Sequence, residues 1–337
     1  MRILLGITGS IAVVKLEELY ERLSSIGDVK IVATPSAINM LQKATNLNIL
    51  TDEDEKSWEW NKILHIELRD WAQIMVIAPC TMNTLAKIAN GLCDNLLTEI
   101  VRAWDNSKPI FIAPAANTKM YENKMTSIQL KNVQEYYNCS IVKPIIGKLA
   151  CGDIGIGKMA NVSTIISTIV EKTKWFKPIL NIPYVPIDNH PGSFGYKRSY
   201  YYHPGVDLYT RDSEPVFACE DGEVLHIGQF TGPPDHQHWE ETYGVVIKGI
   251  HIINYGEIYK PNTIMVGSYV KRGEIIGHVK RVIPEGKERP DILGHSTSML
   301  HFELYDAWTG EFADWKDEKP GNLLDPTELL LKMYTKD

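Results

Sequence analysis

The hydrophobic period changes once along this chain, near residue 173, and that change limits the folds the chain can adopt. Up to about residue 172, short apolar runs rich in Ile and Val alternate with longer segments of helical period. Such alternation is typical of a parallel sheet with helices on both faces. The predicted strands are Arg2–Ile7, Val29–Ala33, Ile74–Ala78 and Ile110–Ala113. We therefore expect an α/β fold with a doubly wound parallel sheet, in which ligands bind beyond the carboxyl ends of the strands.

Beyond about residue 196 the helical period disappears, and short strands alternate with turns. The strands predicted there are 215–225, interrupted by Asp221-Gly222, then 244–248, 269–278 and 299–305. This pattern predicts an all-β domain. Prolines at 178, 183, 186 and 191 favour a stiff linker between the two patterned regions. We expect two domains, residues 1–173 and 196–337, joined by a linker over 174–195, as a length of 337 residues also indicates.

The composition disfavours several classes of protein. A formal net charge of −7 argues against a nucleic-acid-binding surface, which normally carries a basic excess. No apolar run approaches the roughly 20 residues that span a bilayer, and the first apolar run is too short for a signal peptide. The five cysteines form no Cys-x-x-Cys pair. We therefore expect reduced thiols in a cytoplasmic protein, with small molecules or proteins as partners.

A Gly-x-x-Gly-Ser turn at residues 6–10 follows the first predicted strand and opens a helix. Its backbone N–H groups suit a phosphate, although many such turns carry glycine for tight geometry alone. Further motifs follow in order: His-Ile-Glu-Leu-Arg-Asp-Trp-Ala at 65–72, Ala-Pro-Cys-Thr-Met-Asn-Thr at 78–84, Gly-Leu-Cys-Asp-Asn at 91–95, Pro-Ala-Ala-Asn-Thr-Lys-Met at 114–120 and Leu-Ala-Cys-Gly-Asp at 149–153. Over about residues 1–172, their order and spacing resemble the flavin-containing cysteine decarboxylases, in particular the phosphopantothenoylcysteine decarboxylases.

The resemblance implies a Rossmann-like subunit that assembles into homotrimers, with FMN bound at the interface between subunits. The residues implied to contact FMN are Gly9, Ser10, Ile11, Thr34, Ser36, Thr81, Met82, Asn83, Thr84 and Ala115. Such a set is physically sensible, because backbone N–H groups and hydroxyls satisfy a phosphate dianion with little positive charge.

The resemblance also implies a reaction, the decarboxylation of 4′-phosphopantothenoyl-cysteine to 4′-phosphopantetheine in coenzyme A biosynthesis. FMN would oxidise the substrate thiol to a thioaldehyde, which accepts electrons as CO2 leaves and gives an enethiol. His65 maps onto the active-site base and Cys151 onto the acid that protonates the enethiol. Asn117 maps onto the residue that holds the substrate carboxylate. Lys148 and Met159 map onto the flap that carries Cys151, with Lys148 toward the substrate phosphate. Taken alone, the His reads as a hydrogen-bonded residue at a strand start, the Asn as a turn cap and the Cys as a buried thiol.

Two loops depart from the family pattern. Ala116 and Tyr121 stand where the family has Met and Trp. The alanine leaves a smaller wall near the flavin or substrate. Thr81 lies in a loop where Leu-Ser-Ala is usual, and it keeps the hydroxyl. Cys151 favours the full redox-neutral cycle, because the peptidyl-cysteine decarboxylases of lantibiotic synthesis stop at the enethiol and lack this Cys-Gly flap.

The second region carries motifs of its own: His-Pro-Gly-Val-Asp at 203–207, Val-Lys-Arg-Gly at 270–273 and Met-Leu-His-Phe-Glu at 299–303. Over about residues 196–330 they resemble the lysostaphin-like zinc endopeptidases. The resemblance implies Zn²⁺ held by His203, Asp207 and His301, since three protein ligands plus a water make a catalytic zinc site. That family's other catalytic histidines are replaced by Met299 and by Glu257, the latter a candidate base or fourth ligand. We therefore expect metal binding with reduced or altered peptidase activity.

The sequence leaves three functions open. The first is the FMN-dependent decarboxylase fused to a metal-binding β domain. The second is a flavin-binding regulatory module without decarboxylation. The third is a metallohydrolase whose flavin domain serves only for assembly. The His-Gln-His segment at 236–238 is interpreted as a solvated loop, because no third ligand accompanies it.

Overall fold

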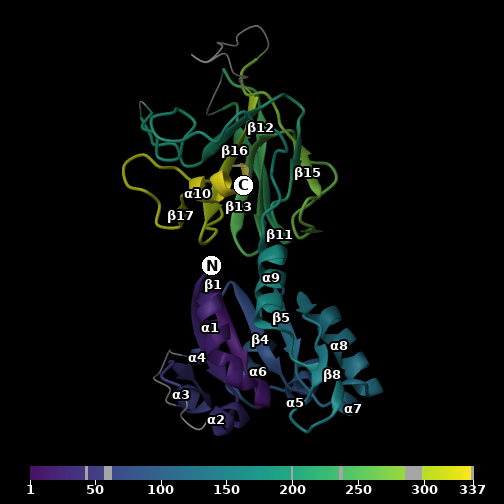
Figure 1. The fold of residues 1–337 in the computed structure, drawn as a ribbon. Coiled ribbons are helices and arrows are strands. Elements are labelled where there is room, and N and C mark those ends of the chain that lie inside the picture. The colour runs from purple at the N-terminus through teal and green to yellow at the C-terminus, as the bar shows by residue number, and fades with distance from the viewer. Residues whose placement is uncertain (42–44, 57–62, 199, 235–237, 285–297, 335–337) are drawn as a thin grey trace. The chain divides into compact units, whose positions relative to one another are not determined.

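The structure is a computed structural model that describes all residues except 42–44, 57–62, 199, 235–237, 285–297 and 335–337 (Figure 1). The chain forms two compact units, Met1–Thr173 and Lys174–Asp337. No helix in the described part of the chain is long and apolar enough to cross a membrane. His236 and Gln237 of the His-Gln-His segment lie outside the described residues, and so does His295, which precedes the 299–303 motif in the sequence.

A parallel sheet forms the centre of the N-terminal unit, and its six strands in the described residues run in the order β3-β2-β1-β4-β5-β6. They are β1 (Arg2–Ile7), β2 (Asp28–Ala33), β3 (Ile49–Leu50), β4 (Ile74–Cys80), β5 (Ile110–Pro114) and β6 (Cys139–Ile141). Strand β4 is buried along its whole length, as expected for a strand covered on both faces. The order reverses between β1 and β4, where Rossmann-like sheets bind ligands, so the predicted N-terminal fold is confirmed.

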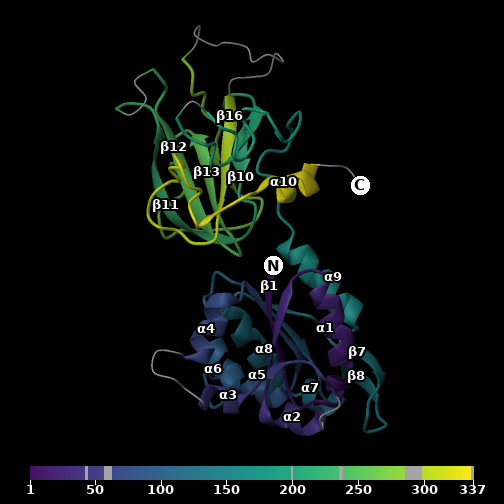
Figure 2. The same cartoon turned by 90° about the vertical axis from the view of Figure 1, so that its left-hand side faces the viewer.

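Helices cover both faces of this sheet, with α1 against α9 on one side and α5 against α6 and α8 on the other (Figures 1 and 2). The helical elements are η1 (Ile11–Lys15), α1 (Leu16–Ser24), α2 (Pro35–Leu41), α3 (Asp52–Lys56), α4 (Leu64–Trp71), α5 (Met82–Ala89), α6 (Leu96–Arg102), α7 (Thr118–Tyr121), α8 (Lys124–Tyr136) and α9 (Val162–Thr173). Helix α1 buries Leu16, Leu19 and Leu23, the apolar stripe expected from its period. An antiparallel hairpin of β7 (Ile145–Lys148) and β8 (Ile154–Lys158) carries the Cys-Gly segment at its tip.

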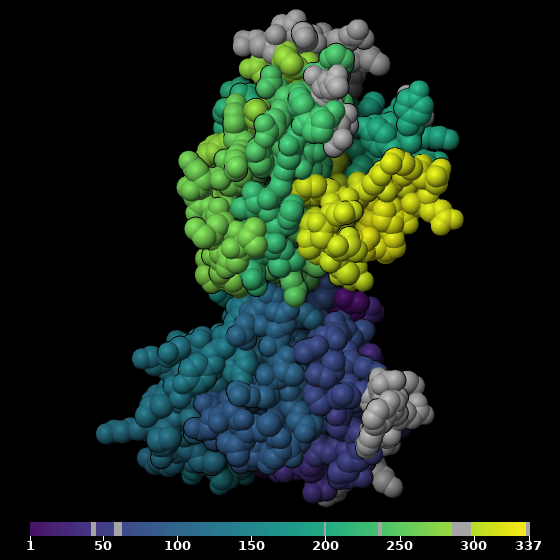
Figure 3. Space-filling model, turned by 180° about the vertical axis from the view of Figure 1, so that it is seen from behind, coloured from purple at the N-terminus to yellow at the C-terminus, as the bar shows by residue number. Residues whose placement is uncertain are grey.

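An antiparallel sheet forms the C-terminal unit, in the order β14-β11-β12-β13-β16-β17 with β9 also paired to β16. The strands are β9 (Val206–Thr210), β11 (Gly222–Thr231), β12 (Thr242–Lys248), β13 (Ile252–Ile258), β14 (Tyr269–Val270), β16 (Ser298–Tyr305) and β17 (Leu323–Leu324), with β10 (Pro215–Phe217) and β15 (Ile275–His278) as a separate pair. The sheet agrees with the predicted all-β pattern. The sequence pattern missed one helix, α10 (Thr327–Tyr334), which buries Leu330 and belongs to the last part of the chain, yellow in Figure 3.

The proline-rich segment 174–195 is part of the C-terminal unit, which corrects the predicted linker. Trp175, Ile179 and Val185 are buried in the same core as the β strands. The indole Nε1 of Trp175 also donates a hydrogen bond to Oε2 of Glu220 at 2.9 Å. These apolar residues anchor the segment to the core of the C-terminal unit.

Candidate functional sites

A cavity of about 400 Å³ opens beyond the carboxyl ends of β1 and β5. It brings together seven of the predicted site residues: Ser10, Ile11, Ala115, Asn117, Lys148, Cys151 and Met159. These residues come from the turn after β1, the segment after β5 and the β7–β8 hairpin. Three parts of the chain far apart in sequence therefore meet at the edge where a parallel sheet binds ligands.

A second, more polar cavity of about 260 Å³ is lined by Gly9, Thr34, Ser36, Thr81, Asn83 and Thr84. The Oγ1 atom of Thr34 is buried there and has no hydrogen-bond partner in the described structure. A Cβ atom on Gly9 would lie 2.4 Å from Cβ of Ser36, so only glycine lets the turn approach α2 this closely. An orphaned hydroxyl in a cavity rich in Ser, Thr and Asn fits a phosphate or ribityl group, and thus fits FMN.

Local capping fixes the loops that line both cavities. Ser10 Oγ accepts a hydrogen bond from Ala12 N at 3.3 Å, and Thr81 Oγ1 accepts one from Thr84 N at 3.3 Å. Thr8, which the sequence analysis missed, ties the turns after β1 and β4 together: its hydroxyl donates to Pro79 O and accepts from Thr81 N. A buried threonine at the end of a predicted strand was the available signal. Met82 lines neither cavity and is buried in the core, although it was predicted at the FMN site.

A polar cluster joins Asn117 to the tip of the β7–β8 hairpin. Asn117 Oδ1 caps α7 by accepting from Lys119 N at 2.9 Å, which leaves its amide Nδ2 to donate to Cys151 Sγ at 3.1 Å and to Asp153 Oδ2 at 3.0 Å. The Cys151 thiol donates to the same Asp153 oxygen at 3.3 Å. These hydrogen bonds, first that from Asn117, lower the pKa of Asp153. Asp153 was not singled out from the sequence, although it belongs to the Cys-Gly-Asp motif.

His65 lies in the first turn of α4, not at a strand start, and lines neither cavity. Its Nδ1 lies 2.6 Å from Oε1 of Glu55, and its backbone N–H donates to Oε2 of the same residue at 3.0 Å. Glu99 Oε2 is 3.9 Å from Nδ1. One oxygen of Glu55 therefore contacts the imidazole and the other accepts from the backbone N–H, so Glu55 fixes the orientation of the His65 ring.

The N-terminal half of the chain matches a known protein family. The sequence model of a family described as flavoprotein matches residues 1–174. The chain belongs to the flavoprotein family. The match confirms a flavoprotein over residues 1–172, which carry the predicted flavin-site residues.

Relatives of this flavoprotein cover its N-terminal half. A probable phosphopantothenoylcysteine decarboxylase of Arabidopsis thaliana is 52% identical over 175 residues, which are 50% of this chain and 86% of that protein. A solved PPC decarboxylase mutant complexed with pantothenoylaminoethenethiol is 45% identical over 50% of this chain and 95% of its own, with a TM-score of 0.48. The FMN binding protein AtHal3 is 46% identical over 50% and 94% of the two chains, with a TM-score of 0.46. The identity to the Arabidopsis protein makes the N-terminal unit a phosphopantothenoylcysteine decarboxylase-like flavoprotein.

The C-terminal unit of the flavoprotein holds a second, buried site. His203 Nε2, His301 Nδ1 and Asp207 Oδ1 form a nearly equilateral triangle with sides of 3.1, 2.9 and 3.1 Å. Zinc bonded at 2.0–2.1 Å in a tetrahedron places neighbouring ligand atoms roughly 3.3 Å apart. The fold brings together the residues that the sequence analysis predicted as metal ligands, because β9 and β16 are paired with Asp207 opposite His301.

Each histidine of the triangle has a second ring nitrogen that points away from it, and the hydrogen bond of that nitrogen fixes the tautomer. His203 Nδ1 lies 2.9 Å from the carbonyl oxygen of Ser193, which accepts only, so this nitrogen carries the proton. His301 Nε2 lies 3.1 Å from Oε1 of Glu303, whose other oxygen accepts from Asn254 and Tyr305. When both imidazoles are neutral, three lone pairs therefore converge inside the triangle. Such a donor set requires a cation and fits a divalent metal ion.

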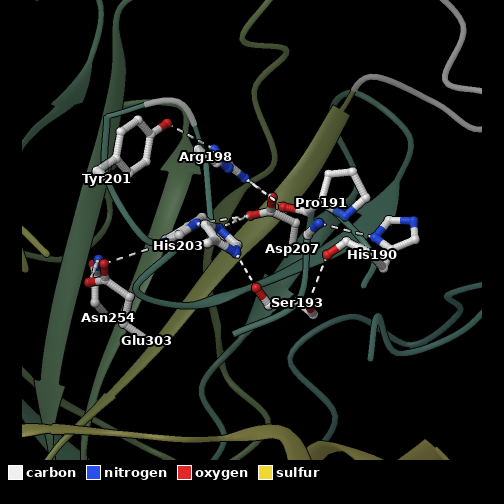
Figure 4. A network of polar contacts seen from close by, with 11 residues as sticks. His190, Pro191, Ser193, Arg198, Tyr201, His203, Asp207, Asn254 and Glu303 are labelled. Atoms are coloured by element: carbon white, nitrogen blue, oxygen red, sulfur yellow. Dashed lines mark hydrogen bonds and ion pairs between the residues drawn. The ribbon is translucent and has the colours of Figure 1, made fainter. Parts of the chain in front are cut away.

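Arg198 completes the charge pattern around this site (Figure 4). Its guanidinium donates to Asp207 Oδ2 at 3.0 Å and to the Tyr201 hydroxyl at 3.1 Å. Burial and the nearby Asp207 raise the pKa of Glu257 to about 8 in the metal-free chain. The sequence analysis identified neither Arg198 nor Glu303, because their roles depend on contacts with distant residues.

Proposed function

We propose that the N-terminal unit, with FMN bound, decarboxylates 4′-phosphopantothenoyl-cysteine to 4′-phosphopantetheine in the cytoplasm, a step of coenzyme A biosynthesis. The observation that carries this proposal is the larger of the two cavities, where Asn117 from the segment after β5 meets Cys151 from the β7–β8 hairpin, beside the turn after β1. The 52% identity to a probable phosphopantothenoylcysteine decarboxylase supports the same substrate class.

In this proposal the chain's own residues divide the work. FMN, when bound, supplies reversible two-electron chemistry at the substrate thiol. The Asn117 amide holds the substrate carboxylate, Lys148 faces the substrate phosphate, and the Cys151 thiol donates its proton to the enethiol carbon. Ser10, Thr34 and Thr81 hold the flavin phosphate and ribityl hydroxyls.

His65 takes up a proton at Nε2 in this scheme. Because His65 lines neither cavity of its own chain, we propose that the protein is a homotrimer in which the His65 of one subunit serves the cavity of the next.

The direct test uses the purified full-length chain. We expect a yellow protein with a flavin absorbance spectrum, a native mass of three chains, and CO2 release from 4′-phosphopantothenoyl-cysteine. A protein that stays colourless after incubation with FMN would refute the proposal. A yellow protein that releases no CO2 would instead support the regulatory flavin-binding alternative.

Glu55 provides a sharper prediction about His65. We expect Glu55→Gln to lower kcat for CO2 release roughly tenfold, because the imidazole loses its carboxylate partner. A general base as a whole contributes a rate factor of about 10²–10⁴, so this is part of its effect. KM and FMN content should not change. Glu53→Gln is the matched control, since Glu53 lies on the same helix α3 but pairs with Lys56 and is highly exposed. An equal loss in both variants would contradict the positioning role.

We propose further that the C-terminal unit is a lysostaphin-like domain that holds Zn²⁺ through His203, Asp207 and His301. The convergence of three lone pairs on one point supports this assignment. Met299 offers a thioether where the peptidase family has a histidine, so we expect little or no peptide hydrolysis.

A further inference from the structure

Glu257 is a buried carboxylate without a sufficient partner. Glu257 is only 8% exposed, and its Oε2 atom has no hydrogen-bond partner in the described structure. Its backbone has φ 62°, in the left-handed region that costs a non-glycine residue free energy. Burying an unpartnered carboxylate on a strained backbone is unfavourable unless something else compensates for it.

A bulge in β13 explains where this side chain lies. Tyr243 and Val245 of β12 pair with Ile258 and Tyr255, so Gly256 and Glu257 together oppose a single residue of β12. Gly256 is itself the register partner of His301 on β16. The bulge therefore places Glu257 next to the metal-binding triangle, where Asp207, His301 and Arg198 are its charged neighbours.

The charge balance of the site favours a further carboxylate. A divalent ion and the Arg198 guanidinium bring three positive charges, and the Asp207 and Glu303 carboxylates bring two negative ones. An ionised Glu257 cancels the remaining positive charge, which reduces the cost of burying the metal.

Glu257 nevertheless stands outside the ligand triangle. The ligand atoms of His203, Asp207 and His301 lie within 4.8 Å of one another, and Glu257 does not belong to that cluster. Three protein ligands leave one position of a tetrahedral metal without a protein ligand.

We propose that a metal held by His203, Asp207 and His301 keeps one coordination position open toward Glu257, and that this position admits small neutral ligands in preference to anions. This inference rests on the metal site of the proposed function. The ligand must be small because the three metal-binding residues are at most 5% exposed. Anions are disfavoured because the Glu257 carboxylate lies beside the position they would occupy.

The test uses the full chain loaded with Co²⁺, whose visible absorption changes when a ligand enters the metal's coordination shell. Azide is the anionic probe. We expect wild-type protein to bind azide weakly and Glu257→Gln to bind it about tenfold more tightly, because one repelling charge is removed at constant shape. Glu257→Asp keeps the charge and should resemble the wild type. Glu223→Gln, the same charge change at an exposed position of β11, is the control and should also resemble the wild type.

Three outcomes would overturn the proposal. Equal azide affinity in wild type and Glu257→Gln would mean that Glu257 does not face the open position. A wild type that shows no spectral response at any azide concentration, with Co²⁺ lost from Glu257→Gln, would make Glu257 a direct fourth ligand. Failure of the wild type to bind Co²⁺ at all would refute the metal site itself, and this is seen before azide is added.

Discussion

Replacement of His65 by Asn is expected to slow CO2 release by about 10²–10⁴-fold, the usual contribution of a general acid–base group. Asparagine keeps a polar side chain of similar size but cannot take up a proton at neutral pH. FMN content should be unchanged, because His65 is not among the residues implied to contact FMN. Single-turnover CO2 release and the flavin absorbance spectrum of the purified variant measure the two effects.

Cys151→Ser is the informative companion to this variant. The thiol lies 3.1 Å from the Asn117 amide in the same cavity, but its proposed role comes after CO2 has left. We therefore expect Cys151→Ser to release CO2 and to accumulate the enethiol in place of the saturated thiol, as detected by mass spectrometry of the product. If the wild type turns over and neither substitution alters its rate or product, the assigned roles are wrong.

Removal of the metal is expected to make the C-terminal unit lose stability as the pH rises. In the metal-free chain burial opposes protonation of His301, but its hydrogen bonds to Asp207 and Glu303 outweigh burial and raise its pKa from 6.5 to about 10. Burial raises the pKa of Glu257 from 4.5 to about 8. Both groups bind a proton more tightly in the folded chain, so their stabilisation is present at low pH and is lost as the pH rises through the folded pKa.

The affected range follows from these values. Between pH 6.5 and about 10 the metal-free unit loses the contribution of His301, and up to about pH 8 it also loses that of Glu257. Each tenfold difference in proton affinity corresponds to about 1.4 kcal/mol, so the total is several kcal/mol. Calorimetry with EDTA should show an unfolding temperature that falls across this range, whereas the Zn²⁺-loaded protein should change little because the cation replaces the proton.

Two controls accompany the calorimetry. The transition of the N-terminal unit, identified by its response to FMN, should not respond to EDTA. His203→Ala should make the C-terminal transition insensitive to added Zn²⁺. Identical pH dependence with and without EDTA in the wild type would contradict a metal at this site.

Much of the N-terminal site could be predicted from the sequence. Thirteen predicted residues line the two cavities, because residues directly after parallel strands meet at one sheet edge whatever the detailed packing. Met82 and His65 are the exceptions. Their positions depend on which side of a helix faces the cavity and on the Glu55 contact, which no local motif encodes.

The sequence by itself determined the change from strand–helix alternation to strands alone, and with it the Rossmann-like sheet, the flavoprotein family and the antiparallel C-terminal unit. These features depend on local periodicity and on motifs within short stretches of chain. Only the tertiary structure decided that segment 174–195 packs into the C-terminal core, that Glu55 holds His65, and that Glu257 lies beside Asp207 and His301. Asp207 and His301 are 94 residues apart in sequence. Contacts of that kind are set by how the strands pair and bulge, so the chemistry of the metal-binding triangle emerges only when the sheet is formed.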